Sequence, residues 1–148
     1  MYETYTTVIG TVISNPRRRQ TSAGEEVLSF RMACNSRRLD KRSGEWADGP
    51  ALYLTVSCWR RLIDGAAPVV AKGRPVIAHG QIKTNEYISD SGERRADLEM
   101  TASVIGMDLS RCTVSFEGMM PRPTTATQSP GAERVSANSS DPVDAAAA

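Results

Sequence analysis

The stretch from Ala51 to Arg60 alternates strictly between apolar and polar positions. Successive side chains of a β-strand point to opposite faces, so this pattern predicts a strand whose two faces differ in character. One face carries Leu52, Leu54, Val56 and Cys58, and the other carries Tyr53, Thr55, Ser57 and Trp59. The first face can enter a core. The second places two large aromatic rings beside hydroxyl groups, which a core strand does not need.

Other segments of the chain show a similar alternation or a high content of β-forming residues. They predict strands at residues 4–14, 27–35, 74–87 and 95–105, and a further short strand at Thr113–Phe116. The residues expected to face inward are Leu28, Phe30, Met32 and Cys34, then Val76, Ala78, Gly80 and Ile82, then Leu98, Met100, Ala102 and Val104. Residues 17–26 and 36–50 are polar and rich in turn formers, so we expect them to be loops.

One helix is predicted between the third and fourth strands. The segment Leu62–Ala71 is alanine-rich, and Lys72-Gly73 closes it with a C-terminal capping signal. Three strands, a short helix and two more strands are the layout of an all-β OB-fold, a five-stranded Greek-key barrel. Other small barrels share most of this pattern, so the order of elements alone leaves them open.

The chain changes character at Met119. Proline, serine, threonine and alanine dominate the remaining residues, and no hydrophobic periodicity is left. Such a composition cannot bury enough apolar surface to fold. We therefore expect a folded domain over residues 1–118 and a disordered tail over residues 119–148.

Composition points to a cytoplasmic protein. No apolar run approaches the roughly 20 residues that span a bilayer, and the stretch Met1–Thr4 has none of the features of a secretory signal. The three cysteines, Cys34, Cys58 and Cys112, are odd in number and far apart. This favours buried thiols in a reducing compartment over a disulfide framework or a zinc site.

The net charge is only +1, but the basic residues are clustered. The clusters are Arg17-Arg18-Arg19, Arg37-Arg38, Lys41-Arg42, Arg60-Arg61 and Arg94-Arg95. Clusters of this kind are either solvated loops or a local positive track for a polyanion. Charge alone does not decide between the two.

The outward aromatic residues indicate what a positive track would bind. Tyr53 and Trp59 share one strand face, and Tyr87 shares a face of the next strand with Lys83 and His79. Nucleic-acid bases stack on aromatic rings for about 1–3 kcal/mol each, whatever the base. Neighbouring lysines and arginines neutralise the phosphates. The combination favours single-stranded nucleic acid, although a lone outer aromatic more often lines an oligomer contact.

The sequence carries no signature of an enzyme. Its single histidine, His79, lies on a predicted strand, and no Cys-His, Ser-His-Asp or His-Glu-x-x-His arrangement is present. The acidic residues are scattered and do not suggest a two-metal site. We expect no catalytic residue, no metal and no cofactor, and we interpret His79 as a surface or interface residue.

Several motifs occur together in a characteristic order over residues 4–105. They are Val8–Val12, Ser22–Gly24, Leu28–Ala33, Val56–Arg60, Lys72-Gly73, Gly80–Thr84 and Tyr87. In order and spacing the chain resembles the bacterial single-stranded DNA-binding proteins (SSB). The segments Arg42–Trp46 and Gly106–Phe116 are similar to the actinobacterial branch, in which an additional C-terminal strand clamps subunits together.

The resemblance implies a homotetramer that wraps single-stranded DNA with little sequence preference and does no chemistry. It assigns base stacking to Tyr53, Trp59 and Tyr87, and gives Trp46 either stacking or anchoring of its loop. Leu39 stands at a further position where the family places a stacking aromatic. The expected phosphate contacts, taken as a class, are Arg31, Arg37, Arg38, Lys41, Arg60, Lys83 and Arg94.

One departure concerns the tail. The family's tail usually ends in an acidic tip with proline and an aromatic residue that docks partner enzymes, whereas Asp141–Ala148 has two acids and no aromatic. Recruitment of partners through this tip is therefore not expected. Together with Leu39, the tail suggests a paralogous SSB that acts in recombination, repair, DNA uptake or segregation. The expected location is cytoplasmic and nucleoid-associated, and the expected assemblies include mixed tetramers with a main SSB.

Two other classes of function stay open at the level of sequence. The chain could be an OB-fold interaction module whose aromatics form a protein interface, or an RNA-binding OB protein of the cold-shock type. A salt-dependent preference for single strands over duplex separates DNA binding from the first. Competition between deoxy- and ribo-oligomers separates it from the second.

Overall fold

A computed structural model describes residues 2–121 of the chain. Residues up to Ser115 form one unit, and residues 116–121 are the described part of a second. All regular elements belong to the first unit. They are β1 (Thr4–Val12), β2 (Arg17–Gln20), β3 (Glu26–Leu39), β4 (Trp46–Trp59), α1 (Arg61–Ala66), β5 (Pro75–Ile88) and β6 (Arg94–Met107).

The strands close into a barrel. They follow the order β1-β5-β6-β4-β3-β2, and a further pairing of β1 with β3 joins the two sides. The neighbours are antiparallel except β4 and β6, which pair in parallel at Thr55–Ser57 and Glu99–Thr101. Five strands thus form the barrel, and β2 extends it at the start of β3. With α1 between β4 and β5, this confirms the predicted OB-fold.

The barrel interior holds a single apolar core. Its buried members are Val8, Val12, Leu28, Phe30, Met32, Leu54, Val56, Cys58, Ile63, Ala66, Val70, Val76, Ala78, Met100 and Ala102. Most positions predicted to face inward are among them. Burial of this apolar surface is the main term that stabilises the fold.

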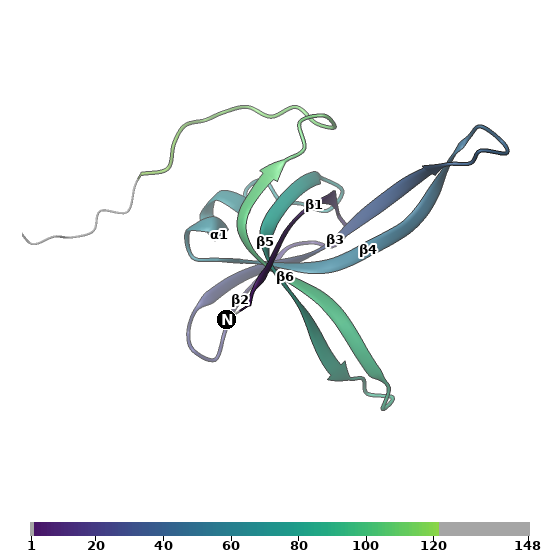
Figure 1. Cartoon of the computed structure of the whole chain (residues 1–148). Helices are drawn as coiled ribbons and strands as arrows, with labels where there is room; N and C mark the ends of the chain where they lie inside the picture. The colour runs from purple at the N-terminus through teal and green to yellow at the C-terminus, as the bar shows by residue number, and fades with distance from the viewer. Residues whose placement is uncertain (1, 122–148) are drawn as a thin grey trace, which may run out of the picture. The chain divides into compact units, whose positions relative to one another are not determined.

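Two hairpins extend beyond the barrel in different directions (Figure 1). β3 and β4 stay paired as far as Leu39 and Trp46, and β5 and β6 as far as Ile88 and Arg94. The prediction of a loop over residues 36–50 is therefore wrong for most of that segment. Polar side chains do not prevent strand pairing there, because both faces of a projecting hairpin are open to water.

Two residues predicted to face the core are exposed. Leu52 has the expected orientation, but it lies where the β3–β4 hairpin leaves the barrel, and it is 44% exposed. Val104 is 59% exposed because β6 contains a bulge: His79 pairs with Val104 and Gly80 with Ala102, so Ser103 is the extra residue. An extra residue reverses the alternation, which turns Val104 outward and Ile105 toward the core.

Three further predictions from the sequence differ from the structure. β2 forms within residues 17–26, which were predicted to be a loop, because Arg17–Gln20 pairs with the start of β3. The helix ends at Ala66 rather than Ala71, since Pro68 has no N–H to continue it. No strand forms at Thr113–Phe116, and none follows Met107 in the described part of the chain.

Most of the tail, from residue 122 on, and the tip Asp141–Ala148 lie outside the described residues. Over residues 2–121, no helix has the length and apolar character needed to cross a membrane.

Candidate nucleic-acid interface

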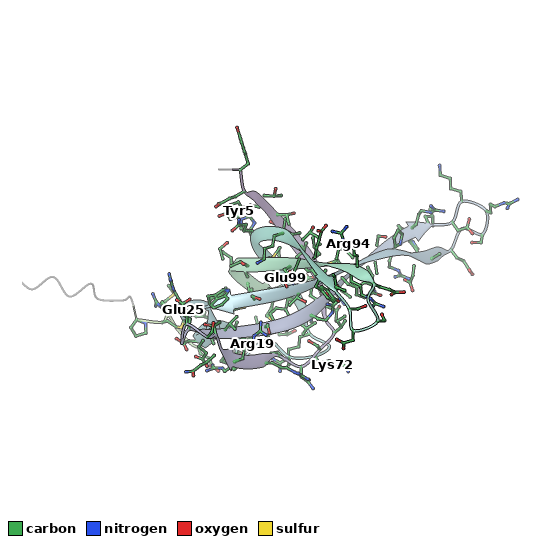
Figure 2. All side chains as sticks on the ribbon, turned by 90° about the horizontal axis from the view of Figure 1, so that it is seen from below. Tyr5, Arg19, Glu25, Lys72, Arg94 and Glu99 are labelled. Carbon is green, nitrogen blue, oxygen red and sulfur yellow. The ribbon has the colours of Figure 1, made fainter. Side chains whose placement is uncertain are left out.

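The outward-pointing side of β3, β4, β6 and β5 forms one continuous surface, which we call the outer sheet face. Strand register aligns Arg31, Thr55, Glu99 and Lys83 in one row across it. The next row holds Ser29, Ser57, Thr101 and Gln81. Figure 2 shows the side chains from below, with Glu99 labelled. The two rows in the middle of the face are thus polar and contain no apolar side chain.

On this face β4 carries aromatic rings near its middle and at its C-terminal end. Tyr53, 54% exposed, pairs with Ala33 near the base of the hairpin, and Trp59, partly buried, pairs with Val27 at the other end. Six residues of strand separate them by about 20 Å. Each ring is therefore an independent platform for a base.

Trp46 joins the same face through a second bulge. Ser36 of β3 faces both Gly49 and Pro50 of β4, and its hydroxyl donates to the Pro50 carbonyl oxygen at 2.9 Å. The extra residue shifts the alternation of β4, so Trp46 pairs with Leu39 on the side that carries Tyr53. The ring is 61% exposed. Strict alternation would have placed it on the opposite side.

Tyr87 lies on the other hairpin beside two arginines. A hollow near the hairpin end is lined by Tyr87, Arg94, Arg95 and their neighbours. Register places Arg95 directly across from Tyr87, while Arg94 pairs with Ile88 and points to the other side. Arg95, which was not among the sequence candidates, therefore accompanies the ring. In the sequence, the Arg94-Arg95 doublet was the only signal that pointed to Arg95.

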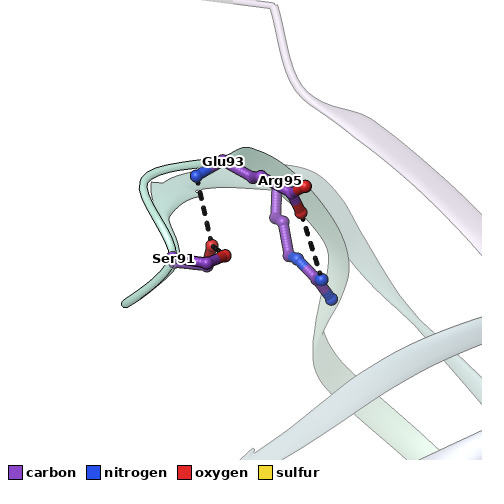
Figure 3. Close-up of polar contacts among 4 residues, drawn as sticks. Ser91, Glu93 and Arg95 are labelled. Carbon is purple, nitrogen blue, oxygen red and sulfur yellow. Dashed lines mark hydrogen bonds and ion pairs between the residues drawn. The ribbon is translucent and has the colours of Figure 1, made fainter.

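The turn that carries Arg95 is held by local contacts. The Arg95 guanidinium pairs with the Glu93 carboxylate at 3.4 Å, and the Glu93 N–H donates to the Ser89 hydroxyl at 3.3 Å (Figure 3). Gly92, with φ at 82°, supplies the left-handed residue that this turn needs. The hairpin end therefore has a defined shape.

Several of the predicted phosphate contacts already face acidic groups. Lys83 Nζ lies 3.6 Å from Glu99 Oε2, Arg60 Nη2 lies 3.7 Å from Glu25 Oε1, and Arg37 Nε lies 4.0 Å from Asp48 Oδ1. All three cations are well exposed, so each pair contributes little and can exchange its carboxylate for a phosphate. The neighbouring carboxylates nevertheless reduce the local positive potential.

The remaining candidates differ in their surroundings. Arg31 is partly buried, and its guanidinium donates to the Thr55 hydroxyl at 3.4 Å. Arg38 pairs with Ala47 on the side of the hairpin opposite Arg37. Lys41 is exposed in the turn between β3 and β4. The structure thus brings Arg31 close to the centre of the outer sheet face and leaves Arg38 and Lys41 at the far end of a hairpin.

His79 and Cys58, whose residue types often take part in catalysis, have structural surroundings. His79 Nδ1 lies 2.9 Å from the Thr7 hydroxyl, and its ring stacks on Tyr5 at the surface. Burial raises the pKa of the Cys58 thiol to about 12, so it stays protonated at neutral pH. Within residues 2–121, no group of His, Cys, Asp or Glu side chains is arranged to hold a metal ion.

Comparison with known proteins identifies the family of the chain. The Single-strand binding protein family matches residues 4–108. A single-stranded DNA-binding protein of Corynebacterium glutamicum is 35% identical over 108 residues, which cover 73% of this chain and 48% of that protein. The chain thus spans about half the length of this relative.

Two solved structures share the fold. The small single-stranded DNA-binding protein of Streptomyces coelicolor superposes with a TM-score of 0.68 at 30% identity, over 76% of this chain and 100% of that one. The second single-stranded DNA-binding protein (SSBb) of Mycobacterium smegmatis gives a TM-score of 0.61 at 36% identity, over 79% and 100%. With the family match over residues 4–108, these likenesses show that the chain belongs to the single-strand binding protein family.

Proposed function

We propose that this chain binds and protects single-stranded DNA without strong sequence preference, by stacking bases on Tyr53, Trp59, Tyr87 and Trp46. The observation that carries the proposal is the placement of Trp46, Tyr53 and Trp59 on one continuous face of β4. The relatives named above are single-stranded DNA-binding proteins. No catalytic step is part of this function.

The mechanism follows from the two kinds of group on the face. Rings accept any base, because every base has an aromatic surface, and each stack contributes about 1–3 kcal/mol. Arginine and lysine side chains take up phosphates and release counterions, which makes the affinity fall with salt. Exposed ion pairs such as Lys83–Glu99 open at little cost when a phosphate arrives.

A fluorescence titration tests the proposed function. We expect a poly-deoxythymidine oligomer to quench the emission of the two tryptophans strongly, and the affinity to fall as salt rises. Duplex DNA and a ribo-oligomer of equal length serve as competitors. Equal affinity for duplex, or no binding at low salt, would favour the interaction-module alternative, and a preference for the ribo-oligomer would favour RNA binding.

We also propose a homotetramer, in line with the family resemblance. Tyr5 and Ile9 on β1 and Val104 on β6 expose apolar surface on the two strands that flank β5. β1 pairs with β3 only at Thr11 and Val12, which leaves much of that edge without a strand partner among the described residues. In this proposal the segment Gly106–Phe116 forms the expected clamp strand only when it pairs with another subunit. We expect sedimentation equilibrium to give four times the chain mass of 16.0 kDa, and a monomer would contradict it.

The physiological role that we propose is that of a second SSB, in recombination, repair, DNA uptake or segregation. Leu39, where the family places an aromatic, supports it, as does the likeness to a small SSB and to a second SSB over their whole lengths. Such a protein acts with cytoplasmic, nucleoid-associated DNA, alone or in mixed tetramers. We expect it not to replace the main SSB of a host cell, and normal growth of a strain that depends on it alone would contradict this role.

A further inference from the structure

β2 carries its three arginines on two different sides. Arg17 pairs with Ser29 and Arg19 with Val27, whereas Arg18 pairs with the core residue Leu28. Ser29 points to the outer sheet face, so Arg17 and Arg19 extend that face beyond β3. Arg19 is labelled in Figure 2. β2 therefore adds two cations to the candidate interface.

A hollow lies on this face between β2 and the middle of β4. Its lining consists of Ser14, Asn15, Arg17, Ser29, Phe30, Arg31 and Thr55. Two guanidinium groups, three hydroxyls and an amide line it, and no carboxylate does. Groups of this kind are typical partners of a phosphate oxygen.

Arg31 is held in place at this hollow. The backbone N–H of Arg31 donates to the Ser14 hydroxyl at 2.9 Å, and its backbone carbonyl oxygen accepts from the Ile13 N–H at 2.9 Å. Its guanidinium donates to the Thr55 hydroxyl. A positioned guanidinium loses less side-chain entropy when it binds a phosphate than a freely moving one. The hollow is therefore partly preorganised.

Arg17, Arg19 and Arg31 differ from Arg37, Arg60 and Lys83 in having no carboxylate partner among the described residues. None of the ion pairs among residues 2–121 involves Arg17, Arg19 or Arg31. Arg18, on the opposite side of β2, pairs with Glu26 at 3.2 Å. The positive potential of the face is thus concentrated on its β2–β3 side.

The hollow also lies at the right place along β4. Thr55, which lines it, is between the two stacking residues Tyr53 and Trp59 on the same strand face. On the other side of β4 the neighbouring residue is Glu99, whose carboxylate repels phosphate. If bases stack on Tyr53 and Trp59, electrostatics therefore favours a path of the DNA backbone along the β3 side of β4.

We propose that this hollow binds backbone phosphate of single-stranded DNA between the bases on Tyr53 and Trp59, with Arg17 and Arg31 as its donors and Arg19 beside them. The inference rests on the proposed function, because without single-stranded DNA there is no chain of phosphates to place. The proposal places the DNA backbone on the β3 side of β4. It also gives β2, which has no part in the core, a role in binding.

The test compares two faces of β2. Arg17→Gln with Arg19→Gln removes two exposed cations from the outer sheet face, and Arg18→Gln is the matched control on the other side. Affinity for a poly-deoxythymidine oligomer is measured over a series of salt concentrations. Each lost phosphate contact lowers the slope of log K against log salt by about 0.7 for single strands. We expect the double variant to lose about 1.4 from the slope, and Arg18→Gln to keep the wild-type slope.

A second variant tests the partly buried donor. Arg31→Lys keeps the charge but loses the two-pronged guanidinium, so we expect weaker binding with a nearly unchanged salt slope. Equal salt slopes in the wild type, the double variant and the Arg18→Gln control would overturn the proposed phosphate site in the hollow while leaving DNA binding intact. Failure of the wild-type chain to bind at low salt would instead overturn the proposed function itself.

Discussion

Replacing Trp59 by alanine is expected to weaken binding of a poly-deoxythymidine oligomer by about 5- to 150-fold, which corresponds to the loss of one base stack of about 1–3 kcal/mol. The ring lies on the outer sheet face at the end of β4, and it lines a third hollow together with Glu25, Arg60 and Thr101. Arg60 has φ at 54°, an uncommon value for a residue other than glycine, and forms the turn into α1. Trp59 is therefore the last residue of β4, directly before this turn.

The measurement is the same oligomer titration, now with Trp46 as the remaining fluorophore. Tyr53→Ala, at an exposed position, supplies an independent loss of stacking that does not disturb the core. Tyr2→Ala removes a fully exposed ring that precedes β1, outside the four strands of the face, and is the control. Wild-type affinity in both Trp59→Ala and Tyr53→Ala, with thermal stability intact, would show that the bases do not stack on this face.

The alternation of apolar and polar residues was sufficient to predict the barrel strands and most of the core. Burial requires every second residue of a strand with one covered face to be apolar, so the pattern is written directly in the sequence. Alternation alone predicted that Tyr53 and Trp59 face outward and that Leu54 and Val56 face the core. The same rule could not locate the bulges, because a bulge depends on the partner strand.

Both bulges change the side of the sheet to which a residue of a proposed interface points. The one opposite Ser36 brings Trp46 to the side of Tyr53, and the one at Ser103 turns Val104 out to solvent. β2 escaped prediction for a related reason: Arg17–Gln20 has no apolar residue to alternate, and only pairing with β3 makes it a strand. Contacts such as Lys83–Glu99 likewise depend on a register that joins distant segments.

Replacing Gly80 by alanine is expected to destabilise the fold by about 3 kcal/mol or more, and to lower the thermal midpoint by on the order of 10 °C. Gly80 lies on β5 beside the bulge of β6. A Cβ atom built there would overlap the Thr101 carbonyl oxygen and come within 2.7 Å of the Ala102 Cα. Both are backbone atoms of a paired strand, so no side chain can turn aside, and the pairing of β5 with β6 must open.

Gly106→Ala is the matched control on the same pair of strands. The nearest atom to its Cβ would be the Ile77 Cγ2 at 3.4 Å, a contact that a small side-chain movement accommodates. We expect Gly106→Ala to unfold close to the wild-type temperature in circular dichroism, and Gly80→Ala to unfold far below it. Equal midpoints for the two variants would mean that β5 and β6 do not approach at Gly80 as closely as described. Because β6 pairs with β4 across Thr55–Ser57, a loosened β6 would also displace the outer sheet face, and DNA affinity should fall together with stability.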